Sequence, residues 1–209
     1  MVGGVNNIYA DFNESAINRL SEKSPELLYI GSHGYYSNNV LTAKDSLYLF
    51  GKYRKAIINE EEASMYKSGI IMDKSHHSNI MTNGLLTAKE ISMLDLSNTK
   101  LACISACSSG KGKITTEGVY GLQRGFKLAG VQSLLVALWD VDDKATQILL
   151  QSFYNYLKTG KSKHLALRLA QNNVRLYEED NESSINIGDP HVYKDPYYWA
   201  GFVLIDANE

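Results

Sequence analysis

Cysteine is scarce in this chain, and a strong charge imbalance is absent. Only two cysteines occur among 209 residues, Cys103 and Cys107, and two thiols alone do not make a zinc site. Their spacing does not favour a disulfide, and it is not the Cys-x-x-Cys pair of a redox protein. The net charge of −2 gives no reason to expect nucleic acid or an anionic membrane as a partner. We expect no metal ion and no cofactor.

Targeting segments are also lacking. No apolar run approaches the roughly 20 residues that span a bilayer, and residues 1–7 lack the basic and apolar regions of a signal peptide. We therefore expect a cytoplasmic protein. A chain of 209 residues is long enough for one sizeable α/β core and short for two full domains. Residues 1–209 are accordingly expected to form a single domain.

Predicted strands and helices alternate over most of the chain. Apolar runs at 27–31, 101–105 and 132–138 predict strands, and Cys103 in mid-strand is expected to be a buried small hydrophobe. Helices are expected over 87–95, 117–129, 144–157 and 162–177, and a last strand over 199–205. The alternation indicates an α/β fold with a mainly parallel sheet flanked by helices. The weakly patterned residues 51–82 predict a surface insertion, with a short strand possible at 69–72.

Two of the predicted strands end in small-residue turns that contain a cysteine and a histidine. The turns are Ser105-Ala106-Cys107-Ser108-Ser109-Gly110 and Gly31-Ser32-His33-Gly34. Ligand sites in parallel sheets lie beyond the carboxyl ends of the strands, so Cys107 and His33 are expected to meet at one edge. An imidazole can activate a thiol as a nucleophile, and the amides of Gly34 and Cys107 are natural donors to an oxyanion. The alternative is a packed cysteine and an unrelated turn histidine.

Several segments, in the same order along the chain, resemble the CHAT family of caspase-like cysteine peptidases, which often follow tetratricopeptide repeats. Besides the two turns, the matching segments are 85–91, 138–146 with its Leu-Trp-x-Val-Asp-Asp-x-Ala-Thr pattern, and 196–202 with its Pro-Tyr-x-Trp-Ala-x-Phe pattern. The resemblance covers about residues 25–206. It implies a caspase-like three-layer α/β sandwich and a cysteine endopeptidase that cleaves a protein or peptide substrate. It also implies regulation by an upstream repeat or sensor domain.

The resemblance assigns roles to particular residues. Cys107 becomes the nucleophile, His33 the general base or acid, and the amides of Gly34 and Cys107 the oxyanion hole. The substrate residue before the scissile bond would be bound near the nucleophile, at Ser105, and by the loop after the next strand. The candidates in that loop are Trp139, Asp140, Asp142 and Asp143.

Alternatives to parts of this interpretation remain open. An exposed carboxylate in the acidic loop would pair with an Arg or Lys side chain, but Asp142 and Asp143 are also suited to cap the following helix. Residues 108–116 are expected to be a mobile active-site loop. The segment ahead of the histidine strand is short, which suggests a domain trimmed from a longer protein. It also motivates a second function, a latent or non-cleaving regulatory module with the same fold.

Overall fold

The computed structural model describes most of the predicted core. The described residues are 17, 19–20, 22–36, 64–72, 85–105, 112–115, 118–177 and 193–206. The chain divides into two compact units. The larger unit comprises Asn6–Trp139 and Ile205–Glu209, and the smaller one comprises Met1–Val5 and Asp140–Leu204.

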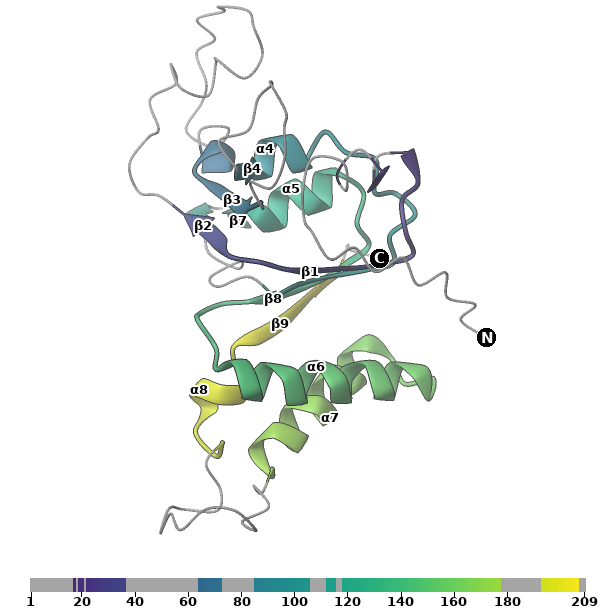
Figure 1. Ribbon diagram of the computed structural model, residues 1–209, viewed down its shortest axis with the longest axis vertical. Coiled ribbons are helices and arrows are strands. Elements are labelled where there is room, and N and C mark those ends of the chain that lie inside the picture. Colours follow the sequence, from purple (N-terminus) through teal and green to yellow (C-terminus); the bar gives the residue numbers. More distant parts are fainter. Residues whose placement is uncertain are drawn as a thin grey trace, which may run out of the picture. The chain divides into compact units, whose positions relative to one another are not determined.

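The larger unit contains a parallel sheet (Figure 1). It contains β1 (Leu27–Gly31), β5 (Leu101–Ser105) and β8 (Ser133–Ala137) in that order, and both neighbouring pairs are parallel. Strand β8 is buried at every position and β5 at all but the last, whereas exposed and buried residues alternate along β1. Fully apolar runs of this kind are typical of strands covered on both faces. The prediction of an α/β fold with a mainly parallel sheet is confirmed.

A second, antiparallel sheet overturns part of the prediction for residues 51–82. It contains β2 (Gly34–Tyr36), β3 (Ser68–Ile71) and β4 (Leu85–Thr87). Strand β3 pairs with β2 on one side and β4 on the other. The short strand expected at 69–72 is therefore confirmed as β3, but the expectation of a surface insertion is wrong for the described residues 64–72. The buried residues there are Ser64, Met65, Ser68, Ile70 and Met72.

The helix predicted over 117–129 is correct only in its second half. Helix α5 (Leu122–Leu128) follows β7 (Gly118–Gly121), which pairs antiparallel with β6 (Gly112–Thr115). Gly118 and the β-prone pair Val119-Tyr120 disfavour a helix that starts at residue 117. Strand β6 supplies the hydrogen-bonding partner that lets these residues form a strand instead. Within the predicted loop 108–116, the described residues 112–115 thus form a strand.

Helix α4 (Ala88–Ile91) and helix α5 pack side by side in the larger unit (Figure 1). Helix α4 begins at the predicted capping box, in which Thr87 and Glu90 satisfy each other's backbone amides, but it ends at Ile91 and is shorter than predicted. Gly125 makes the contact possible. A Cβ atom at that position would lie 2.5 Å from the carbonyl oxygen of Ala88.

The smaller unit contains the predicted helical pair, α6 (Asp143–Lys158) and α7 (Lys163–Arg175). Gly160, with a φ of +81°, makes the turn between them. The predicted last strand is only partly correct, because Trp199 ends α8 (Pro196–Trp199) and β9 begins three residues later (Phe202–Asp206). Among the described residues, no helix is long and apolar enough to cross a membrane.

Candidate active site

His33 lies in a two-residue turn that connects β1 to β2 and is held by both sheets. The Ser32 amide donates to the carbonyl oxygen of Ser105 (3.4 Å), which extends the β1–β5 pairing by one residue. The Ile71 amide donates to the carbonyl oxygen of His33 (2.8 Å). The Ser32 hydroxyl donates to the carbonyl oxygen of Ile71 (2.5 Å). Backbone groups of two sheets therefore position His33, and its side chain is exposed to solvent.

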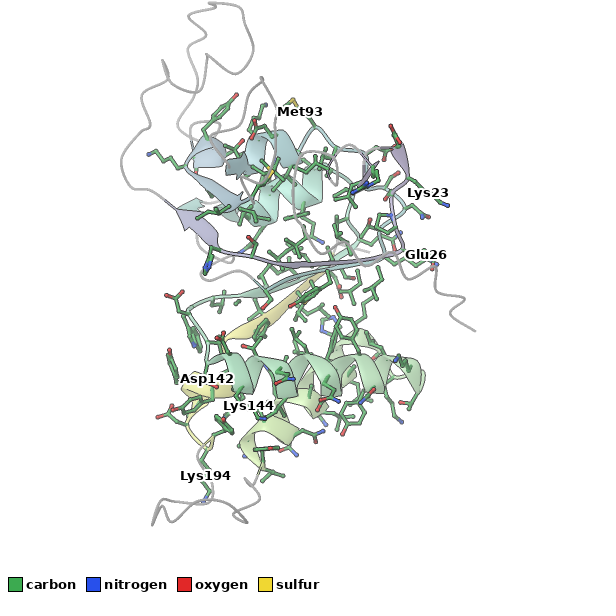
Figure 2. The ribbon with its side chains drawn as sticks, in the orientation of Figure 1. Lys23, Glu26, Met93, Asp142, Lys144 and Lys194 are labelled. Carbon is green, nitrogen blue, oxygen red and sulfur yellow. The ribbon has the colours of Figure 1, made fainter. Side chains whose placement is uncertain are left out.

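Strands β1 and β5 end at the same level. Gly31 is the register partner of Ser105. At the amino ends, the Lys100 amide donates to the carbonyl oxygen of Glu26 (2.8 Å; Glu26 is labelled in Figure 2). In the sequence His33 follows Gly31 by two residues, and Cys107 follows Ser105 by two residues.

The predicted nucleophile itself lies outside the described residues, as do residues 106–111. The structure therefore shows that β1 and β5 end side by side. That Cys107 and His33 lie close to each other stays a prediction. The other cysteine, Cys103, lies in mid-strand and is fully buried, as predicted.

The amide of Gly34 is directed away from the β2–β3 ladder. Opposite residues of an antiparallel pair alternate between hydrogen-bonded and non-hydrogen-bonded positions. The Ile71 amide bonds to His33, so these two form a hydrogen-bonded pair, and the next pair, Gly34 with Ile70, is the non-hydrogen-bonded one. The Gly34 N–H consequently faces away from β3, as a donor to an oxyanion must.

Ser105, a predicted pocket residue, is half-buried, and its side chain hydrogen-bonds the phenol of Tyr29. Tyr29 is the register partner of the buried Cys103. Burial raises the pKa of Tyr29, the hydrogen bond from Ser105 acts in the opposite direction, and Cys103 adds to the rise. The phenol is therefore neutral at physiological pH.

Tyr29 is not among the residues predicted for the site. An exposed tyrosine in an alternating strand looks in sequence like an ordinary surface residue, and only the β1–β5 register brings it beside Ser105. No signal in the sequence alone could have identified it.

The acidic loop after β8 provides a helix cap. The Asp142 carboxylate accepts from the Ala145 amide (2.9 Å) at the start of α6, where Figure 2 labels Asp142. This confirms capping for one of the two aspartates. Asp143 is the exposed first residue of α6, and the carbonyl oxygen of Asp140 accepts from the Tyr197 hydroxyl. Trp139 is half-buried and belongs to the larger unit, whereas the three aspartates belong to the smaller one, so their pocket role stays a prediction.

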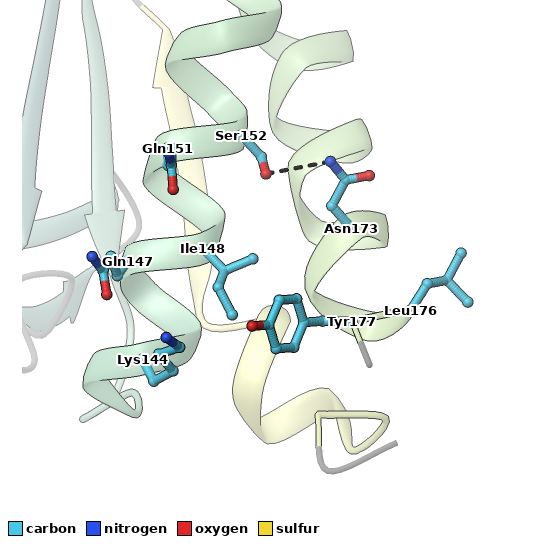
Figure 3. A pocket seen from close by; sticks show the side chains of 8 residues that line it. All are labelled: Lys144, Gln147, Ile148, Gln151, Ser152, Asn173, Leu176 and Tyr177. Carbon is cyan, nitrogen blue, oxygen red and sulfur yellow. Dashed lines mark hydrogen bonds between the residues drawn. The ribbon is translucent and has the colours of Figure 1, made fainter. Parts of the chain in front are cut away.

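A groove of about 520 Å³ lies between α6 and the end of α7 (Figure 3). The Asn173 side-chain amide donates to the Ser152 hydroxyl across it (3.3 Å). Its lining residues are Lys144, Gln147, Ile148, Gln151, Ser152, Asn173, Leu176 and Tyr177. This lining contains no cysteine, histidine or carboxylate, so the groove does not contain the groups expected for the predicted chemistry.

Comparison with known proteins identifies a family. The family model described as the CHAT domain matches residues 5–207. The chain is also similar to tetratricopeptide repeat protein 28 of Mus musculus and of Homo sapiens. Each is 32% identical over 124 residues, which are 59% of this chain and 4% of the relative. The chain therefore spans only a small part of the length of these relatives.

Proposed function

Because the chain belongs to the CHAT domain family, whose fold is caspase-like, we propose that it is a cysteine endopeptidase with a His33–Cys107 dyad. The main support is the in-register end of β1 and β5, where the Ser32 amide bonds to Ser105. His33 is one residue beyond that bond, and Cys107 is two residues beyond it, a length of chain that spans at most about 7 Å.

The proposed reaction uses an acyl-enzyme intermediate. His33 takes the proton of the Cys107 thiol, and the thiolate attacks the peptide carbonyl carbon. The amides of Gly34 and Cys107 donate to the resulting oxyanion. The C–N bond then breaks, and His33 gives its proton to the leaving amine. Finally, His33 deprotonates a water molecule that hydrolyses the thioester and restores the thiol.

The proposed substrate pocket includes Ser105 and Trp139, with Asp140 and Asp143 as the carboxylates of its wall. Asp142 is the weakest candidate, because one of its oxygens accepts the amide that starts α6. A carboxylate that is already hydrogen-bonded to a helix amide has fewer lone pairs for a substrate guanidinium.

A second function is a latent module that cleaves only when an upstream repeat domain acts on it. The names of the two relatives support it, because both are tetratricopeptide repeat proteins and the matched part is 4% of each. In the latent module the catalytic residues are the same His33 and Cys107, and the upstream repeat domain controls when they are active.

The proposal is tested by cleavage of a peptide library with the wild-type chain, Cys107→Ala and His33→Ala. We expect each substitution to lower kcat/KM by about 10²-fold or more, because each removes one of the two interdependent groups. The matched controls are Cys103→Ala and His164→Ala, which change a buried cysteine and an exposed histidine outside the site. Both controls should retain activity. Full activity in either dyad variant, with a melting temperature like that of the wild type, would refute the assignment.

A further inference from the structure

One face of the β1–β5 pair places a phenol close to the strand end that precedes His33. In a parallel pair, register partners point to the same face, and side chains two residues apart share it. Tyr29 pairs with Cys103 and Gly31 pairs with Ser105, so all four positions lie on one face. The two residues nearest the carboxyl edge on that face, Gly31 and Ser105, precede His33 and Cys107 by two residues each.

The Tyr29 ring runs along the strand toward that edge. A Cβ atom on Gly31 would lie 3.0 Å from Tyr29 Oη and 3.2 Å from its Cε1 atom, which is tighter than ordinary van der Waals contact. The phenol therefore occupies the space that a side chain at position 31 would fill. Its hydroxyl reaches Ser105, which hydrogen-bonds it.

The phenol is held in place and is also accessible. Tyr29 retains 53% of its surface exposed, although part of it is buried among its neighbours. The hydrogen bond to Ser105 restricts its orientation. A rigid, exposed aromatic ring with a polar tip is a surface that can bind a substrate side chain at little cost in conformational entropy.

We propose that Tyr29 is a specificity-determining residue, and that its phenol closes the bottom of the subsite for the substrate side chain that precedes the scissile bond. The inference rests on the proposed function, because that function places the scissile carbonyl next to Cys107 and Gly34. In this arrangement the ring limits the length of the side chain that enters. The paired hydroxyls of Tyr29 and Ser105 favour an uncharged side chain that ends in a hydrogen-bonding group.

The test measures how fast Cys107 reacts with three peptidyl acyloxymethyl ketones that carry alanine, leucine or glutamine next to the reactive group. Tyr29→Ala should raise the rates for leucine and glutamine relative to alanine by about tenfold or more, because it deepens the subsite by several methylenes. Tyr29→Phe keeps the ring and should lower the glutamine rate relative to leucine about three- to tenfold, through loss of one hydrogen bond.

The matched control is Leu27→Ala. Leu27 lies on the same face of β1 and is 49% exposed, but it is one strand period farther from the carboxyl edge. It should leave all three rate ratios unchanged. Unchanged ratios in both Tyr29 variants, or equal shifts in Leu27→Ala, would each overturn the inference.

The same variants separate this inference from the proposed function. If the ratios shift as expected but no peptide in the library is cleaved, the subsite stands and the endopeptidase assignment fails. If peptides are cleaved and the ratios do not depend on Tyr29, the assignment stands and the subsite inference fails.

Discussion

At the residue scale, the candidate site is built largely from main-chain groups. His33 receives a hydrogen bond at its carbonyl oxygen, its neighbour Ser32 bonds to both sheets, and Gly34 directs its amide away from β3. Side chains at these positions can rotate, but the backbone amides and carbonyls cannot move without breaking the hydrogen bonds between neighbouring strands. The proposed oxyanion donor is thus preorganised, which is the condition under which such a donor is most effective.

This geometry makes Gly34→Pro an informative substitution. Proline has no N–H, and at a non-hydrogen-bonding position of a strand it breaks no ladder bond. We expect kcat/KM to fall about 10²- to 10³-fold, while the midpoint of thermal unfolding changes by only a few degrees. The control is Tyr36→Pro, because Tyr36 pairs with Ser68 two residues along and its amide has the same outward direction. Equal activity losses in both variants would show that the Gly34 amide has no special role.

At the scale of the elements, the contact between α4 and α5 fixes the helices of the larger unit beside each other. Gly125 lies on the buried side of α5, directly against the Ala88 carbonyl at the start of α4. The capping box at Thr87 fixes that same start, with the Thr87 amide 2.8 Å from the Glu90 carboxylate. A short helix of four residues depends on such anchors, because its own hydrogen bonds are too few to stabilise it.

The prediction at this scale is that Gly125→Ala destabilises the chain. Helix propensity alone would favour alanine by about 1 kcal/mol, but the new Cβ would lie 2.5 Å from a backbone oxygen that cannot rotate away. We expect a net loss of about 1–3 kcal/mol in the free energy of unfolding, measured by urea denaturation. Leu128→Ala, at an exposed position of the same helix, should change it by less than about 0.5 kcal/mol. A stabilised Gly125→Ala variant would contradict the packing.

The elements also differ in how well the sequence predicts them. Strands β1, β5 and β8 and helices α6 and α7 were predictable, because their apolar periodicity and capping residues are local signals. Strand β3 was predicted as a short strand at 69–72, whereas β2, β6 and β7 were not predicted, since each has only three or four residues. Their hydrogen bonds go to partners that no local pattern identifies.

The candidate site divides in the same way. The strand-end turn of His33 was found from its local pattern, and its position beside the end of β5 agrees with the structure. The capping by Asp142 was an open alternative that only the hydrogen bond to Ala145 decides. Tyr29 was missed, because its significance comes entirely from a strand pairing across more than 70 residues of sequence.

At the scale of the whole molecule, the chain is a small part of the proteins to which it is similar. The family model spans both compact units, from residue 5 to residue 207, whereas the matched part is 4% of each tetratricopeptide repeat relative. The question at this scale is whether the 209-residue chain has a competent site without a partner. The backbone bonds that hold the His33 turn are all within the larger unit.

We therefore expect the chain alone to react with a peptidyl acyloxymethyl ketone at Cys107 within minutes, and Cys103 to stay unmodified until the chain is unfolded. Intact-mass measurement with peptide mapping would count and locate the adducts. The Cys107→Ala chain should acquire none under native conditions. Reaction that begins only after a repeat-containing partner is added would instead favour the latent module.

The turn between β1 and β2 has a consequence for how this architecture can change over generations. Main-chain hydrogen bonds to Ser105 and Ile71 hold it, and these survive replacement of almost any side chain nearby. A homologue that loses Cys107 or His33 by mutation would thus keep an intact turn between β1 and β2, with the Gly34 amide still facing outward. A homologue of this kind is a starting point for the evolution of a protein that binds an extended polypeptide without cleaving it.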